Sequence, residues 1–175
     1  MMFIALPVAA HAQELLDLKS ATLIRDEYRM DITGVHDEIL ALANAIPADK
    51  YDYRPSPEVR TVAEVLMHVA GEWLYVVPIS VGGKPPADFG PPREAMPRLE
   101  KITTKADVLA QLEKAWAHCL SVLNGADPAQ LQGKFEPAKM SLVRATLRVS
   151  GDQHEHLGQL IAYARANGIK PPWSK

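Results

Sequence analysis

The stretch from about residue 142 to residue 167 most constrains what this chain can fold into. Apolar residues recur there at steps of three and four, the spacing of one helix face: Leu142, Ala145, Val149, Leu160 and Tyr163. Asp152 and His156 fall on the same stripe. Because such a stripe faces a core, a carboxylate on it is costly unless it is paired or binds a metal. Asp and His four residues apart on a helix are close enough to share one ion.

A second segment, residues 61–79, offers a further metal ligand. Its helical stripe carries His68 and Glu72 among apolar residues. Bundles build metal sites by packing helices that each place a polar ligand on the inward face. His68, Asp152 and His156 are therefore the candidate metal ligands. Glu72 could be a further ligand, a general base that takes part in catalysis, a partner that orients the imidazole, or a residue at the rim of the bundle.

Helical periodicity occurs in four segments, and no segment shows a credible strand pattern. Thr61 with Glu64 forms a capping box at the start of the second segment, and Ser141 is the expected cap of the last. A chain of 175 residues can form one domain with a sizeable core. The sequence therefore predicts an all-α fold, a four-helix bundle with helices at about residues 21–45, 61–77, 105–123 and 142–167.

A long connection, residues 82–102, separates the second and third predicted helices. It contains three glycines and five prolines, so we expect no helix there. Loops of this length in compact domains often cover a site or cross a bundle. Because this connection follows the helix that carries His68, it is either a lid over the site or a bare crossover.

The composition excludes several functions. A net charge of −2 gives no basic surface, so we expect no nucleic-acid partner. Cys119 is the only cysteine, which excludes an internal disulfide framework and a multi-cysteine zinc site, and we expect it to be buried as a small hydrophobic residue. No apolar run has the length of a membrane span. His36 lies beside the stripe of the first helix without a convergent partner, so we expect a partly exposed or edge histidine and not a ligand.

Residues 1–12 differ from the rest of the chain. They are largely apolar and end in an Ala-His-Ala pattern that fits a signal-peptidase cleavage site, although the usual basic region is absent. We expect either a truncated export signal or an apolar segment packed on the bundle. In the first case residues 13–175 form the mature single-domain protein, periplasmic or secreted; otherwise the protein is cytoplasmic.

Two stretches resemble a known family. Residues 156–173 (HLGQLIAYARANGIKPPW) are similar to the C-terminal signature of the DinB-like (damage-inducible) metalloenzymes. Residues 53–69 resemble the second-helix signature of the same family, and the resemblance covers nearly the whole chain after about Ser20. It implies a four-helix bundle that holds a divalent metal with three histidines, one from the second helix and two from an H-x-x-x-H pair in the last.

Carried over position by position, His68 matches the first family histidine and His156 the last. Asp152 stands where the family has the middle histidine. The departure leaves either two histidines and one carboxylate, a set that suits Zn, Ni or Mn, or a site in which metal binding is lost.

The resemblance implies an enzyme that acts on a small molecule. Characterised relatives include thiol S-transferases that use low-molecular-weight thiols, so a thiol transferase is one candidate and a metal-assisted hydrolase is the other. A non-catalytic binding module, in which the polar cluster is only structural, is the alternative. The resemblance also suggests a homodimer.

Overall fold

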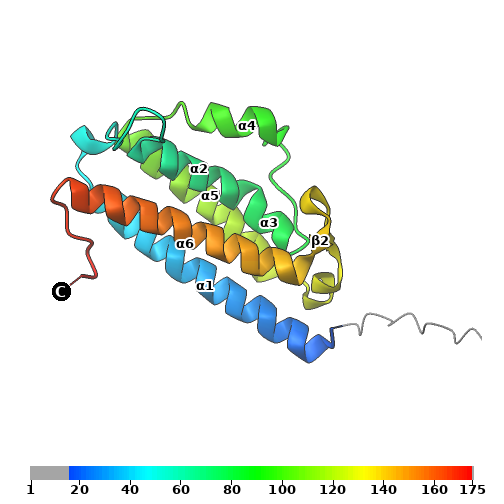
Figure 1. Ribbon diagram of the computed structural model, residues 1–175. Coiled ribbons are helices and arrows are strands. Elements are labelled where there is room, and N and C mark those ends of the chain that lie inside the picture. Colours follow the sequence, from blue (N-terminus) through cyan, green and yellow to red (C-terminus); the bar gives the residue numbers. More distant parts are fainter. Residues whose placement is uncertain (1–15, 175) are drawn as a thin grey trace, which may run out of the picture.

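Four helices run alongside one another and enclose the core (Figure 1). The computed structural model describes residues 16–174. Within these residues there are six α-helices and little strand, which confirms the all-α prediction. The four helices that the sequence predicted are α1 (Leu18–Ala45), α2 (Val62–Leu74), α5 (Lys105–Gly125) and α6 (Leu142–Ala166).

These helices begin where the sequence places capping residues. At the start of α2, the Glu64 backbone N–H donates to Thr61 Oγ1 at 3.1 Å, and the Thr61 N–H donates to Glu64 Oε2 at 2.7 Å. The Ser141 hydroxyl likewise accepts a hydrogen bond from the Arg144 N–H at the start of α6. The capping box and the serine cap satisfy backbone donors that have no partner inside the helix, so they fix the first turn of each helix.

Helix α2 lies deepest in the molecule. It packs against α5, α6 and α4 (Pro92–Leu99). Of its 13 residues, only Glu64 and His68 are not buried. The core around it contains large, fully buried side chains from all four predicted helices: Ile32, Ile39, Leu66, Trp73, Leu112 and Leu160.

The second predicted helix is shorter than expected, and the connection after it contains a helix. Tyr75 leaves helical geometry with φ −127°, so α2 ends at Leu74 and a short α3 (Val76–Ser80) follows. Helix α4 lies within residues 82–102, where the sequence indicated only a loop. Its first residue is Pro92, and a proline in the first turn costs no hydrogen bond because that N–H has no partner in the helix.

Helix α4 lies directly on α2 (Figure 1). Gly71 makes this close approach possible, because a Cβ at that position would collide with the side chain of Met96. Ala95 and Leu99 on the inner side of α4 are buried. The connection is therefore packed against the helix that carries His68.

Short elements link α5 to α6. A two-stranded antiparallel pair, β1 (Lys134–Phe135) and β2 (Met140–Ser141), precedes α6. The remaining elements are the 3-10 turns η1 (Ala48–Lys50), η2 (Pro128–Gln132) and η3 (Glu136–Ala138). Strands of two residues are too short to give a periodic pattern, which explains why the sequence did not predict them.

His36 is buried, so the expectation of a partly exposed histidine was wrong. Its ring stacks on Trp116 with centroids 3.9 Å apart and is tilted against Trp73 at 5.2 Å. Burial lowers the pKa of His36 below its ordinary value, although Asp37 opposes this shift. Cys119 is buried as predicted, and burial raises the pKa of its thiol.

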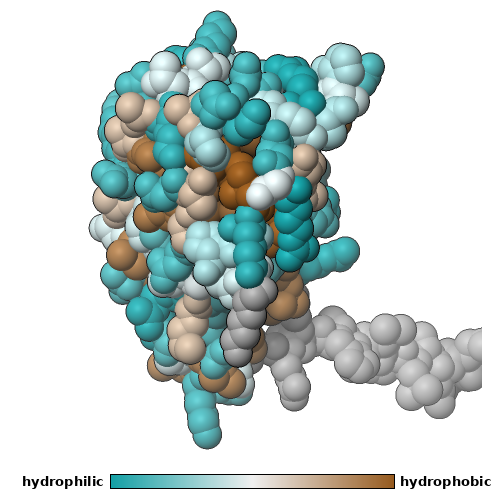
Figure 2. All heavy atoms as spheres, turned by 90° about the vertical axis from the view of Figure 1, so that its left-hand side faces the viewer, coloured by the Kyte–Doolittle hydropathy of each residue, from teal (hydrophilic) through white to brown (hydrophobic). Residues whose placement is uncertain are grey.

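The surface at the end of the bundle where α6 finishes is mostly hydrophilic (Figure 2). Hydrophobic residues are visible near the centre of this face and are scattered along its left side and lower end (Figure 2). Among the described helices, none combines the length and apolarity needed to cross a bilayer.

Residues 1–12 lie outside the described part of the chain, so the export signal and the location that depends on it stay predictions.

We expect Thr61→Ala to lower the free energy of unfolding by about 1 kcal/mol, because it removes the side-chain half of the capping box. Urea denaturation monitored by circular dichroism measures this change. Thr103→Ala is the matched control, since Thr103 is exposed and Thr104 provides the cap of α5. Equal stability of the two variants would contradict a role for the Thr61 cap.

Candidate metal centre

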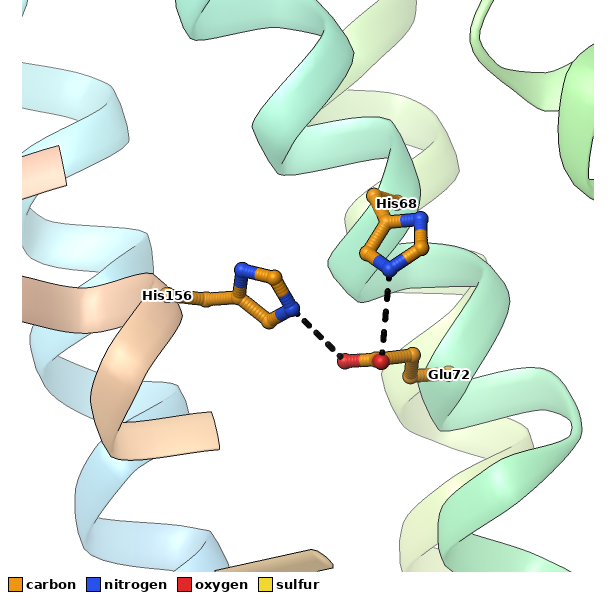
Figure 3. A group of neighbouring side chains, drawn as sticks. All are labelled: His68, Glu72 and His156. Atoms are coloured by element: carbon orange, nitrogen blue, oxygen red, sulfur yellow. Dashed lines mark ion pairs between the residues drawn. The ribbon is translucent and has the colours of Figure 1, made fainter. Parts of the chain in front are cut away.

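Three side chains from two helices converge inside the bundle (Figure 3). His68 and Glu72 lie one helical turn apart on α2, and His156 faces them from α6. Each offers one ligand atom, and these atoms all lie within 4.8 Å of one another. The sequence predicted that His68 and His156 would meet, and the structure brings them together with ring centroids 5.0 Å apart.

Both imidazoles direct Nε2 at the same carboxylate (Figure 3). His68 Nε2 lies 3.4 Å from Glu72 Oε1, and His156 Nε2 lies 3.5 Å from Glu72 Oε2. His156 Nε2 is buried and has no hydrogen-bond partner among the described residues. A buried nitrogen without a partner costs free energy unless a ligand satisfies it. An ion between these groups would satisfy it, so the residues present fit a divalent metal.

Glu72 is held by a hydrogen-bond relay from the core. Trp73 Nε1 donates to Gln153 Oε1 at 2.8 Å, and Gln153 Nε2 donates to Glu72 Oε2 at 2.6 Å. The indole can only donate, so it fixes the amide of Gln153 with its NH₂ group toward Glu72. This relay orients the carboxylate as a hydrogen-bond acceptor.

The charges in the cluster oppose the effect of burial. Burial alone would raise the pKa of Glu72, but the close contacts with the His156 and His68 imidazoles outweigh it and hold that pKa below its ordinary value. Burial alone would lower the pKa of His156, but the close contact with the negatively charged Glu72 raises it above its ordinary value. Glu72 is therefore a carboxylate well suited to bind a cation.

Asp152 lies beside the three converging residues but is not one of them. It is half-buried, and burial together with the neighbouring Glu72 carboxylate raises its pKa to about 6. Two adjacent carboxylates repel each other unless a proton or a cation lies between them. The carboxylate that lies with His68 and His156 in the structure is therefore Glu72, whereas the sequence analysis expected Asp152. A metal-binding role for Asp152 stays a prediction.

His68 also contacts Glu100, and the sequence did not reveal this contact. Glu100, at the end of α4, lies with Oε1 3.1 Å from His68 Nδ1. Arg60 Nε donates to the same oxygen at 3.0 Å. Glu100 is 32 residues from His68, and no motif links the two positions, so only the packing of α4 on α2 could reveal this contact.

The other histidines on or near these helices lie outside the cluster. His154 pairs with Asp31 of α1 at 3.0 Å, and its side chain is half exposed. Gln159 donates to the Tyr163 hydroxyl, which in turn donates to the Arg60 carbonyl. These contacts join α6 to the residue before the capping box of α2.

Two imidazoles and one or two carboxylates are the ligand types that Zn, Ni, Mn and Fe share in proteins. Three protein ligands leave positions open for water or substrate, an arrangement typical of catalytic metals.

A protein-family profile identifies the family of the chain. A profile of the DinB superfamily matches residues 32–160, a stretch that contains His68, Glu72 and His156 and well over half of the chain. A search of curated proteins finds no match. The chain belongs to the DinB superfamily.

Proposed function

We propose that this protein binds one divalent metal ion between α2 and α6 and uses it as a small-molecule enzyme. The observation that carries the proposal is the convergence of His68 Nε2 and His156 Nε2 on the buried Glu72 carboxylate, with the His156 nitrogen otherwise unpaired. These helices would act as part of a four-helix bundle whose interior supplies the ligands.

His68 and His156 would hold the ion, and a carboxylate would be the third ligand. The sequence assigns this role to Asp152 and makes Glu72 a candidate general base, among other possible roles. We propose the opposite assignment, because Glu72 is buried within the cluster and Gln153 fixes its orientation. Asp152 is half-buried beside the cluster, a position from which a carboxylate could act as a general base.

The reaction we propose is thiol transfer or hydrolysis of a small substrate. A divalent ion at this position would supply a Lewis acid that lowers the pKa of a bound water or thiol. Asp152 would accept the proton released there, and the Trp73–Gln153 relay would keep Glu72 in place throughout. The homodimer suggested by the family resemblance stays a prediction, which analytical ultracentrifugation tests.

An activity screen with two variants tests this proposal. The protein is reconstituted with Zn, Ni or Mn and assayed with low-molecular-weight thiols and electrophiles, and with chromogenic esters and amides. We expect turnover in one of the two classes, loss of metal in Glu72→Gln, and loss of turnover with metal retained in Asp152→Asn. Bound metal without turnover of either class would favour the binding-module alternative. Metal lost in Asp152→Asn and retained in Glu72→Gln would restore the assignment made from the sequence.

Metal affinity should increase with pH. A proton on His156 Nε2 must leave before the nitrogen can bind a metal, and the pKa of this histidine lies above its ordinary value of 6.5. Below that pKa we expect zinc affinity to fall about tenfold per pH unit for one displaced proton. Isothermal titration calorimetry between about pH 5.5 and pH 8.5 covers this range around the histidine pKa. Affinity that does not change over this range would exclude a histidine ligand.

A further inference from the structure

The long connection between α2 and α5 supplies a charged residue to the candidate metal centre. Glu100 caps the C-terminal end of α4 and lies beside the outer nitrogen of His68, with Oε1 3.1 Å from Nδ1. The same oxygen accepts a hydrogen bond from Arg60 Nε at 3.0 Å. Glu100 is therefore held between two groups, one on α2 and one just before it.

The chemistry of this contact determines which nitrogen of His68 carries the proton. A carboxylate only accepts hydrogen bonds, so the short contact requires a proton on Nδ1. On the other side of the ring, His68 Nε2 lies 3.4 Å from Glu72 in a contact that does not meet hydrogen-bond geometry. A neutral imidazole with its proton on Nδ1 leaves the Nε2 lone pair facing Glu72 and His156, which is the form that can bind a metal.

The packing of α4 holds Glu100 in this position. Ala95 and Leu99 of α4 are buried against the core, and Gly71 of α2 leaves room for Met96. Glu100 follows Leu99 directly, so its backbone is anchored next to a buried side chain. The connection is thus packed against α2 and reaches the centre with one carboxylate.

We infer that Glu100 is a positioning residue that keeps His68 in the tautomer with its proton on Nδ1. The connection between α2 and α5 is accordingly part of the metal centre. The effect on metal affinity rests on the proposed function, whereas the tautomer is a property of the protein without metal. Two measurements therefore separate the inference from the proposed function.

The first measurement is the tautomer of His68 by ¹⁵N NMR of metal-free protein at about pH 8, above the ordinary pKa of histidine. We expect a proton on Nδ1 in the wild-type protein. Glu100→Leu should shift His68 toward the form with the proton on Nε2. Glu100→Gln should keep the wild-type tautomer, because its side-chain oxygen can still accept from both Arg60 Nε and His68 Nδ1. Glu94→Leu is the matched control, since Glu94 is an exposed residue in the first turn of the same helix.

The second measurement is zinc affinity, obtained by competition with a chromogenic chelator. Partners that orient a metal-bound histidine typically contribute about 10–100-fold to affinity, so Glu100→Leu should bind zinc weaker by this factor. Glu100→Gln and Glu94→Leu should stay close to wild type. An unchanged His68 tautomer in Glu100→Leu overturns the inference whatever the zinc result. The expected tautomer shift in a protein that binds no zinc upholds the role of Glu100 and overturns the proposed function instead.

Discussion

Replacement of His156 with alanine should weaken binding of the divalent metal by more than about 100-fold. Groups that only orient a ligand already contribute about 10–100-fold, and His156 provides a ligand atom itself. Its Nε2 is buried, accepts and donates no hydrogen bond among the described residues, and lies 3.5 Å from Glu72 Oε2. The variant therefore removes the nitrogen that a metal would satisfy. Competition with a chromogenic zinc chelator measures the change, and circular dichroism reports whether helix content is kept.

His154→Ala is the matched control for this experiment. His154 lies two residues away on the same helix, pairs with Asp31 on α1, and has a side chain that is 52% exposed. Its removal should leave zinc affinity at the wild-type value. Wild-type affinity in His156→Ala, or an equal loss in both variants, would show that the three converging residues do not form the metal site.

Replacement of Trp73 with alanine should lower the free energy of unfolding by about 3–5 kcal/mol. The Trp73 side chain is 1% exposed and packs against His36 and Trp116 at the centre of the bundle. Its loss would leave a large cavity and would remove the donor that fixes Gln153. The expected change is a large part of the 5–15 kcal/mol that stabilises a typical domain, and guanidinium denaturation measures it.

Trp173→Ala provides the same chemical change at an exposed position. The Trp173 side chain is 39% exposed near the C-terminus, so we expect a change within about 0.5 kcal/mol. Equal losses of unfolding free energy in the two tryptophan variants would contradict a central position of Trp73 in the core. A loss of zinc affinity in Trp73→Ala under conditions in which the variant is still folded would further support the hydrogen-bond relay through Gln153 to Glu72.

The sequence predicted the helices well because their signals are local. The capping box of Thr61 and Glu64 and the serine cap at Ser141 act within a single turn, and each marks the start of a helix in the structure. Helix α4 was missed because its prolines are typical of loops. Pro92 lies in the first turn, and no propensity shows that packing on Gly71 would stabilise so short a helix.

His68 and His156 were predictable because each interrupts an apolar stripe on a helix. That Glu72, and not Asp152, lies with these two histidines was not predictable, because it depends on how α2 and α6 are rotated against each other. Helix α2 is buried on almost every side, so its sequence does not show which residues face α6. His36 illustrates the same difficulty, since tryptophans from two other helices cover it.

The role of Glu100 could not be predicted from the sequence, because it depends entirely on tertiary structure. Its contact with His68 spans 32 residues and arises only after α4 packs on α2. The sequence left open whether the connection is a lid or a bare crossover. In the structure it contacts the candidate metal centre through this one carboxylate.

The most direct test of the account is the metal content of untagged protein purified without chelator, determined by inductively coupled plasma mass spectrometry. We predict about one divalent ion per chain, which is the occupancy of a single three-ligand site, and its loss in both His68→Ala and His156→Ala. The absence of metal in the wild-type protein, even after reconstitution with Zn, Ni and Mn, would contradict the account. The cluster of His68, Glu72 and His156 would then be a structural polar network, as the binding-module alternative requires.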